Sequence, residues 1–191
     1  NPVAAAAHLA ADWVRYDNGR TKYWEIGNEN FGEWEAGYRI NTPNNKDGQP
    51  EFASGQLYGQ HFTIFADSMR KAAQEINKTI KIGAVLFDQA PQGWMTQTTQ
   101  QWNTGVLNAS GTSPDFYSVH NYFTAYHTNA NAAEILNTPI PVTQTMMNYV
   151  KQNLNNAGLS EKPIAMTEWN IFSIGSMQQV SNINALHGVM V

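Results

Sequence analysis

Apolar side chains recur along this sequence at two different spacings, which predict helices and strands in turn. Between Leu57 and Ile76 they return every three or four residues, the spacing of one buried face on a helix of about five turns. A second stripe of this kind runs from Val142 to Leu154 and stops at Gly158. Further helices are predicted over residues 4–16, where Leu9, Trp13 and Tyr16 are spaced for one face, over 94–108, and from 178 onward.

Short apolar runs separate these helices and predict four strands. They cover residues 23–28, 82–87, 116–123 and 164–169. The run at 82–87 is continuous, as in a strand that is buried on both faces. Residues 41–49, which include Pro43 and Gly48, carry turn chemistry and predict a polar loop.

Helices and strands therefore alternate strictly along the chain, which indicates βαβ units, a parallel sheet and an α/β fold class. A doubly wound sheet and a TIM (β/α)8 barrel both fit this order. No glycine-rich phosphate loop follows a predicted strand, and Gly27-Asn28-Glu29 is not a dinucleotide-binding fingerprint. The nucleotide-binding version of the fold is therefore disfavoured.

The composition narrows the class of protein. The 191 residues carry 15 acidic and 11 basic side chains, a formal charge of −4, which argues against binding to nucleic acid. No apolar run approaches the roughly 18 residues of a membrane helix, so we expect a soluble chain without a membrane partner. Cysteine is absent and the histidines show no metal spacing, so we expect no metal and no cofactor. The 21 Asn and 13 Gln outnumber the charged residues and favour a secreted or periplasmic protein, with the cytoplasm left open.

Two of the predicted strands end in a glutamate, Glu29 and Glu168. Catalytic groups of a TIM barrel lie at the carboxyl ends of its strands, so these two side chains could face each other. Hydrolysis of a glycosidic bond uses such a pair: one carboxyl protonates the leaving oxygen, and the other attacks the anomeric carbon or activates water. Position alone leaves open that both glutamates are solvated surface residues.

The flanking residues resemble those of a known family. The segment Trp24-Glu25-Ile26-Gly27-Asn28-Glu29-Asn30 resembles the fourth strand of clan A glycoside hydrolases, and residues 27–37 are similar to the motif of family 51 α-L-arabinofuranosidases. Residues 10–18, 115–122 and 168–170 resemble that family's third helix, sixth strand and seventh-strand motif, in the same order. The resemblance implies that residues 1–191 form a partial catalytic barrel, about strands four to seven with helices three to seven.

The resemblance also implies roles for single residues. Glu29 would be the acid/base and Glu168 the nucleophile of a retaining double displacement that removes terminal α-L-arabinofuranosyl or related pentosyl groups from polysaccharides. Their carboxyl groups should then lie about 5–5.5 Å apart. Asn28 is expected to donate to the sugar hydroxyl next to the anomeric carbon, Tyr122 to hydrogen-bond Glu168, and His120 to line the site.

Three further expectations concern the surroundings of this pair. Glu29 must be protonated while Glu168 is ionised, so the pKa of Glu29 should be raised. Glu25 shares a strand face with Glu29 by alternation, and we expect a buried charge paired with an Arg or His from a strand outside this chain. The aromatic side chains that could stack on a sugar ring are Trp34, Trp169 and Phe172.

Other interpretations stay open. The chain could belong to another clan A glycosidase, such as a xylosidase or an endo-acting agarase, or form an inactive carbohydrate-binding barrel fragment. The partner in each case is an oligo- or polysaccharide, and the resemblance allows an oligomer. The chain begins with Asn1-Pro2 and ends in an apolar stretch, so we expect an internal piece without strands one to three and eight or a C-terminal β-sandwich. Four strands cannot close a barrel, so we expect the isolated piece to be inactive.

Overall fold

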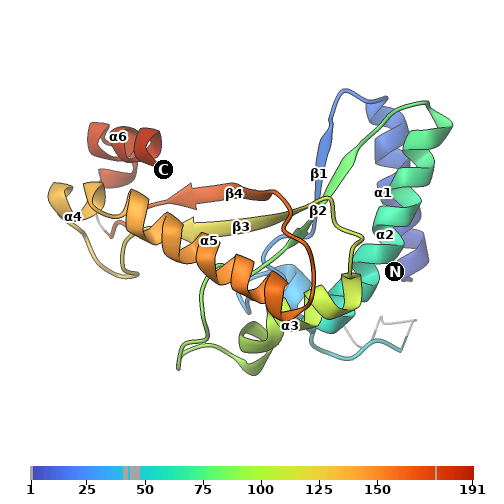
Figure 1. Cartoon of the computed structure of the whole chain (residues 1–191), viewed down its shortest axis with the longest axis horizontal. Coiled ribbons are helices and arrows are strands. Elements are labelled where there is room, and N and C mark those ends of the chain that lie inside the picture. Colours follow the sequence, from blue (N-terminus) through green and yellow to red (C-terminus); the bar gives the residue numbers. More distant parts are fainter. Residues whose placement is uncertain (1, 41–42, 44–47, 175) are drawn as a thin grey trace.

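A computed structural model describes residues 2–40, 43, 48–174 and 176–191 of the chain. Its centre is one sheet of four strands, with helices packed around it (Figure 1). The strands are β1 (Tyr23–Ile26), β2 (Lys81–Val85), β3 (Phe116–Tyr122) and β4 (Ile164–Asn170), close to the four predicted runs. Most of the loop predicted over residues 41–49 lies outside the described residues.

All neighbouring strands are parallel, and their order in space is their order in the sequence, β1-β2-β3-β4. A doubly wound sheet reverses its strand order at a switch point, whereas a barrel adds each strand beside the previous one. The described residues therefore form half of an α/β barrel. Because the strands are parallel, their carboxyl ends all lie at one rim of the sheet.

The helices follow the predicted order, with small differences. They are α1 (Val3–Asp17), α2 (Gly55–Glu75), α3 (Gln97–Ser110), α4 (Ala132–Leu136), α5 (Pro139–Asn156) and α6 (Asn182–Met190), with 3-10 turns η1 (Ala36–Tyr38) and η3 (Gln178–Val180). Helix α4 is an addition to the predicted set. Helix α3 begins later than predicted because Thr96 caps it, its hydroxyl accepting the N–H of Thr99 at 3.2 Å. Among the described residues, no helix combines the length and apolarity that crossing a membrane requires.

Helix α1 does not pack through its large side chains. Leu9, Trp13 and Tyr16, which share one face, are all more than half exposed. The buried face consists of the small side chains Ala7, Ala11 and Val14. Small residues let the backbones of neighbouring helices come close, so alanine content, rather than the aromatic spacing, marks the packing face of this helix against α2.

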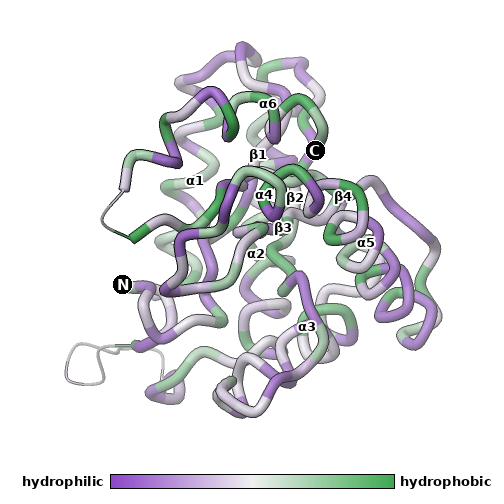
Figure 2. The backbone as a smooth tube through the Cα atoms, turned by 90° about the vertical axis from the view of Figure 1, so that its left-hand side faces the viewer, coloured by the Kyte–Doolittle hydropathy of each residue, from purple (hydrophilic) through white to green (hydrophobic). Residues whose placement is uncertain are grey.

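The core lies between the sheet and the helices. In Figure 2 the strands occupy the middle of the molecule, and the helices lie around them. Strand β2 is buried apart from Lys81, in agreement with its continuous apolar run. The buried positions of the two long predicted stripes include Tyr58, Phe62 and Met69 in α2 and Met146, Val150 and Leu154 in α5.

Tyr58 of α2 fixes the ends of β1 and β2 relative to each other. Its hydroxyl donates to the carbonyl of Ile26 at 2.6 Å and accepts the N–H of Val85 at 2.9 Å. Burial of the ring raises the pKa of the Tyr58 hydroxyl far above its ordinary value, so the hydroxyl stays protonated. A helix side chain therefore sets the rim of the sheet where the β1–β2 ladder ends.

Replacing Tyr58 by Phe should lower the free energy of unfolding by about 1–3 kcal/mol, because the buried N–H of Val85 and carbonyl of Ile26 lose their partner. Chemical denaturation followed by circular dichroism measures this loss. Tyr16→Phe is the matched control, because Tyr16 is 84% exposed and should lose less than about 0.5 kcal/mol. Equal losses in the two variants would show that the Tyr58 hydroxyl does not hold the strand ends.

Candidate active site

Glu29 lies in the turn that follows β1. The strand ends at Ile26, and Gly27 and Glu29 both have left-handed backbone conformations, with φ angles of 87° and 40°. The φ angle of Gly27 favours glycine, because side chains with a Cβ atom rarely adopt this conformation, and a Cβ atom here would also lie 2.2 Å from Oδ1 of Asn30. The prediction that the strand extends to Glu29 is therefore wrong in this detail. The backbone turn after β1, and not the alternation of side chains along the strand, sets the direction of the Glu29 carboxyl.

A β-bulge in β4 sets the direction of Glu168. The ladder pairs Val119 with Met166, which packs against the core. The next pair is His120 with Glu168, which leaves Thr167 as an extra residue on β4. Simple alternation from Met166 would turn Glu168 toward the core as well. The bulge reverses this, so that Thr167 and Glu168 both contact His120.

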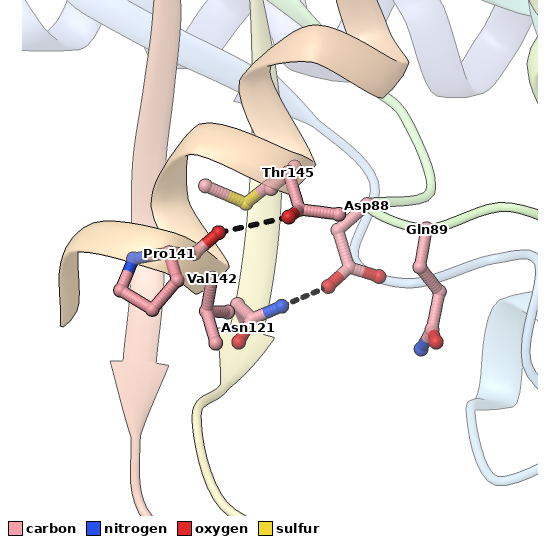
Figure 3. A pocket seen from close by; sticks show the side chains of 7 residues that line it. Asp88, Gln89, Asn121, Pro141, Val142 and Thr145 are labelled. Carbon is pink, nitrogen blue, oxygen red and sulfur yellow. Dashed lines mark hydrogen bonds between the residues drawn. The ribbon is translucent and has the colours of Figure 1, made fainter. Parts of the chain in front are cut away.

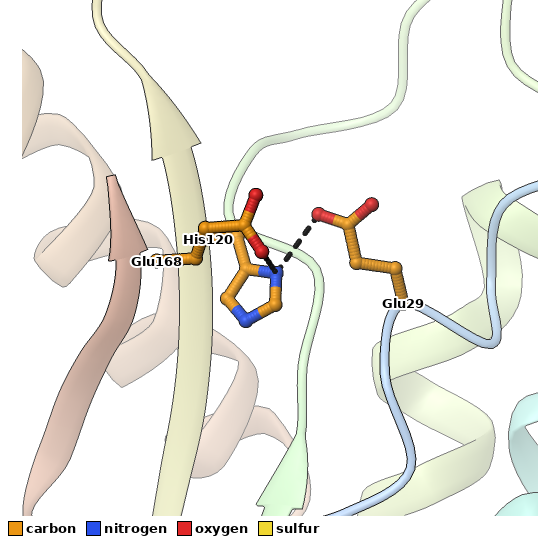
Figure 4. A group of neighbouring side chains, drawn as sticks. All are labelled: Glu29, His120 and Glu168. Atoms are coloured by element: carbon orange, nitrogen blue, oxygen red, sulfur yellow. Dashed lines mark hydrogen bonds and ion pairs between the residues drawn. The ribbon is translucent and has the colours of Figure 1, made fainter. Parts of the chain in front are cut away.

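His120 of β3 lies at the centre of the site (Figure 4). Only 5% of its side chain is exposed. Its Nδ1 atom lies 2.9 Å from Oε1 of Glu29 and 3.5 Å from Oε2 of Glu168, while Nε2 lies 3.1 Å from Oγ1 of Thr167. One oxygen of each glutamate and one ring nitrogen of His120 all lie within 4.8 Å of one another. Three elements remote in sequence thus bring their side chains to one point.

The charges in this cluster stabilise one another. Burial acts to lower the pKa of His120, but the hydrogen bond to Glu29 and the charges of three nearby glutamates outweigh it and raise this pKa. Burial acts to raise the pKa of Glu29, but hydrogen bonds from His120 and Trp34 outweigh it and lower this pKa below its ordinary value. The expectation of a raised Glu29 pKa is therefore wrong for this arrangement. Both shifts favour a pair in which His120 carries the proton and Glu29 is ionised.

Tyr122 forms the hydrogen bond to Glu168 that the resemblance implies. Its hydroxyl donates to Oε1 at 2.5 Å, and this bond raises the pKa of Tyr122 to about 12, so the phenol remains a donor.

Two of the aromatic residues considered for sugar stacking pack against the protein. Phe172 stacks on Tyr122, with ring centroids 4.7 Å apart and an angle of 20°, and Trp169 packs on His187 of α6 at 5.7 Å.

Trp34 and Asn28 are both exposed next to Glu29. The indole N–H of Trp34 donates to Oε2 of Glu29 at 2.5 Å, while 54% of the residue remains exposed. Asn28 directly precedes Glu29 in the turn and is exposed. Of the four predicted substrate-binding residues, Trp34, His120 and Tyr122 thus contact one of the two glutamates, and Asn28 is the exposed neighbour of Glu29 in the turn.

Glu25 finds its partners within this chain. Its Oε1 atom accepts a hydrogen bond from Oγ of Ser118 at 2.7 Å and lies 3.8 Å from Nε2 of His120. The expectation that a strand outside the chain supplies the partner is therefore wrong. Strand β3 supplies it, because Ser118 and His120 alternate onto the same face of that strand. Glu25 adds a third carboxylate to the surroundings of His120.

Asp88 is a buried acid at the rim that sequence reasoning did not identify. It follows β2 by three residues, is 6% exposed, and accepts a hydrogen bond from Nδ2 of Asn121 (Figure 3). Burial raises the pKa of Asp88 to about 6. Both side chains line a cavity of about 280 Å³ that also includes residues of the first turns of α5. The sequence did contain a signal for this acid, because Asp88 directly follows the apolar run at 82–87, and Glu29 and Glu168 likewise lie at the ends of predicted strands.

The cluster of Glu29, His120 and Glu168 offers the donor atoms of a divalent cation site. Zinc accepts imidazole nitrogen and carboxylate oxygen, and Glu29, His120 and Glu168 provide one such atom each within 4.8 Å. These atoms already have partners, since His120 pairs with Glu29, and Trp34 and Tyr122 donate to the two glutamates. The expectation that this site needs no metal therefore stays a prediction.

Comparisons with known proteins bear on the fold. No known protein family and no curated protein matches the chain. Among solved structures, the family 51 α-L-arabinofuranosidase AbfB from Bifidobacterium longum is similar, with 21% sequence identity, coverage of 79% of this chain and a TM-score of 0.52. The match covers 26% of that protein's chain, so the present chain spans about a quarter of its length. At this identity the similarity shows the fold alone, and it agrees with a half-barrel.

The Glu29–His120 pair makes stability depend on pH. His120 has a raised pKa, so its contribution is full below the ordinary value of 6.5 and is lost as the pH rises through the raised value. Glu29 has a lowered pKa, so its contribution is present above the ordinary value of 4.5 and is lost as the pH falls through the lowered value. The pair therefore stabilises the fold most between those two ordinary values.

Replacing His120 by Gln should reduce the free energy of unfolding more at about pH 5.5 than at about pH 8.5. The expected difference is about 1 kcal/mol, the gap between a charged and a neutral hydrogen bond. Denaturation curves at both pH values measure it. His8→Gln is the control, because the His8 side chain is 73% exposed and should give little difference. An equal loss for His120→Gln at both pH values would argue against the ion pair with Glu29.

Proposed function

We propose that residues 1–191 form the catalytic half of a retaining glycoside hydrolase that removes terminal α-L-arabinofuranosyl, or related pentosyl, groups from polysaccharides. Glu168 acts as the nucleophile and Glu29 as the acid/base. The observation that carries this proposal is the convergence of two glutamates from the ends of different strands, with carboxylate oxygens within 4.8 Å of each other.

The closeness of the two carboxylates favours a covalent intermediate. In retaining glycosidases the carboxyl groups lie about 5–5.5 Å apart, whereas inverting enzymes separate them by about 6.5–9.5 Å to admit a water molecule. Oxygens of Glu29 and Glu168 that lie within 4.8 Å of each other match the closer arrangement. This spacing supports double displacement over direct attack by water.

Glu168 has the properties of a nucleophile. Its side chain is 43% exposed, so a sugar can reach it. The hydroxyl of Tyr122 donates to Oε1, which orients the carboxylate for attack. Oε2 then attacks the anomeric carbon, and the bond to the leaving oxygen breaks as that oxygen receives a proton from the acid/base.

The Glu29–His120 pair supplies this proton. It passes from Nδ1 of His120 over 2.9 Å to Glu29, and from Glu29 to the leaving oxygen. In the second half of the reaction, ionised Glu29 accepts a proton from the water that attacks the glycosyl ester of Glu168. The imidazolium of His120 provides the proton that the acid step requires. Once that charge is lost, Glu29 no longer has the neighbour that lowers its pKa, so it is a stronger base for the second step.

Asn28 and Trp34 bind the sugar. The exposed amide of Asn28 donates to the hydroxyl next to the anomeric carbon, a contact that strengthens as positive charge develops there. The half-exposed ring of Trp34 offers an apolar surface to the C–H face of a sugar while its N–H holds Glu29. The role of Trp34 is supported by its hydrogen bond to Glu29, and that of Asn28 by its exposed place directly before Glu29 in the turn.

The active protein requires strands beyond these four. A TIM barrel closes with eight, and within the described residues β1 and β4 each have a neighbour on one side only. We therefore propose that the chain works as part of a longer barrel and is inactive when isolated.

Assays of the whole protein separate this proposal from its alternatives. Release of nitrophenol from nitrophenyl arabinofuranoside supports it, whereas release from the xyloside alone favours a xylosidase. Release from neither would favour an endo-acting enzyme or a carbohydrate-binding protein without activity. The rate should be unchanged by EDTA, since the reaction uses carboxylates; a loss on chelation would favour a metal held by Glu29, His120 and Glu168.

Glu168→Ala should lower kcat by a factor on the order of 10⁴ or more, because the covalent step loses its nucleophile. Azide should restore turnover by attacking from the vacated side, and its product should have the inverted anomeric configuration. Glu161→Ala is the control, because the Glu161 side chain is 59% exposed. A folded Glu168→Ala variant that azide does not rescue would argue against this assignment.

Glu29→Gln should lower kcat by about 10²–10⁴-fold on a substrate with a poor leaving group, because that group needs a proton to depart. The loss should be much smaller for the glycosylation step of a dinitrophenyl glycoside, whose leaving group departs as an anion. Pre-steady-state kinetics on both substrates measures the contrast, with the exposed Glu33→Gln as the control. Equal losses on the two substrates would remove the acid role from Glu29.

A further inference from the structure

Asp88 and Asn121 form a hydrogen bond on the helix side of β3. Asn121 lies between His120 and Tyr122 in the sequence, and alternation turns it to the opposite face, near the start of α5 (Figure 3). Its Nδ2 atom donates to Oδ2 of Asp88, which is 6% exposed. Burying a carboxylate costs stability, so this contact calls for a physical explanation.

The backbone hydrogen bonds between β2 and β3 stop before this point. Their last ladder pair is Val85 with Ser118, and the N–H of Leu86 still donates to the carbonyl of Ser118 at 2.9 Å. Phe87 then leaves the sheet because Asn103 of α3 occupies both of its backbone groups. Oδ1 of Asn103 accepts the N–H at 2.7 Å, and Nδ2 donates to the carbonyl at 2.8 Å.

Beyond Ser118, the backbone of β3 is therefore held by β4 alone. Within the part of the chain that the structure describes, the bond from Asn121 to Asp88 is the hydrogen bond that joins this end of β3 to the segment after β2. Glu29 lies on the β1–β2 side of the gap and Glu168 on the β3–β4 side. The separation of the two glutamates thus depends on side-chain links: the bond of Asn121 with Asp88 and the hydrogen bond of His120 with Glu29.

We propose that Asp88 is a positioning residue: by holding Asn121 it fixes the end of β3, and with it His120 and Tyr122, relative to Glu29. This inference rests on the proposed glycosidase function of the site. Without the link, the ends of β3 and β4 beyond the last β2–β3 ladder pair can shift relative to β1 and β2, because the hydrogen bond of His120 with Glu29 is then left to hold them. A displacement of about 1 Å in a catalytic group costs on the order of 10²-fold in rate.

The hydrogen bond of Asp88 to Asn121, together with the burial of the acid, favours a role for the bond rather than for the charge. Burial raises the pKa of Asp88 to about 6, with a contribution from the charge of Glu29, while Asn121 and His120 oppose the rise. The charge of Asp88 also acts on Tyr149 of α5, whose pKa is raised by burial and in part by this charge. An acid with a raised pKa destabilises the fold when it ionises, so a neutral acceptor should serve equally well.

Two substitutions separate the hydrogen bond from the charge. Asp88→Asn keeps an acceptor oxygen for Asn121, whereas Asp88→Ala removes it. In the whole protein, measured on the aryl glycoside that it cleaves, Asp88→Ala should lower kcat about tenfold or more with KM changed less than about threefold. Asp88→Asn should keep kcat within about threefold of the wild type, as should the control Asp67→Asn at an exposed position of α2.

Asn121→Ala tests the same link from its donor side. It should lower kcat to a similar level, and the double variant Asp88→Ala/Asn121→Ala should be no slower than the slower single variant, because both remove one bond. Additive losses would overturn the proposal. So would an Asp88→Asn variant as slow as Asp88→Ala, since the charge would then be what matters. If Asp88→Ala does not fold, Asp88→Asn and Asn121→Ala decide between these outcomes.

The ring resonances of His120 report on the link without turnover. In NMR titrations of the whole protein, Asp88→Ala should lower the pKa of His120 because its pair with Glu29 loosens, and Asp88→Asn should change it less. An identical His120 titration in wild type and Asp88→Ala overturns the positioning role, whatever the enzyme does. Retained activity in Glu168→Ala would instead overturn the glycosidase proposal, and this titration would still test the link.

Discussion

The 2.9 Å hydrogen bond between His120 and Glu29 is the contact on which the rest of the site depends. It joins the turn after β1 to the centre of β3, across β2, and the ladder of β3 with β4 then brings Glu168 to the same place. Three carboxylates, those of Glu25, Glu29 and Glu168, approach one imidazole that is almost fully buried. Without the positive charge of that ring, these carboxylates would repel one another at short range.

This arrangement leaves an excess of negative charge at the proposed sugar site. One imidazolium is surrounded by three carboxylates, and no lysine or arginine of the described residues is among the groups that shift its pKa. A glycosyl group that departs from its leaving oxygen develops positive charge at the anomeric carbon. Preformed negative charge at that point stabilises the transition state more than the neutral ground state. The electrostatics are thus consistent with acetal cleavage and unfavourable for an anionic substrate.

The sequence predicts the sheet and the two glutamates because both depend on local signals: continuous apolar runs and an acid at their ends. What it did not predict depends on contacts between distant segments. The pKa of Glu29 is lowered by His120, which is 91 residues away, and the bulge at Thr167 exists only in relation to β3. Helix α4 is a different case, since Asn131 and Glu134 form a capping box whose spacing was present in the sequence.

The bulge in β4 also has a consequence for how the length of this strand can vary. Met166 belongs to the core and Glu168 to the site, although an even spacing normally places two residues on the same face. Because Thr167 is extra, losing one residue here would leave a regular ladder with Glu168 still opposite His120. The same deletion in β3, which has no spare residue on its side of the bulge, would exchange the faces of the strand. Among diverging homologues, loss of one residue should therefore be tolerated at this point of β4 and selected against in β3.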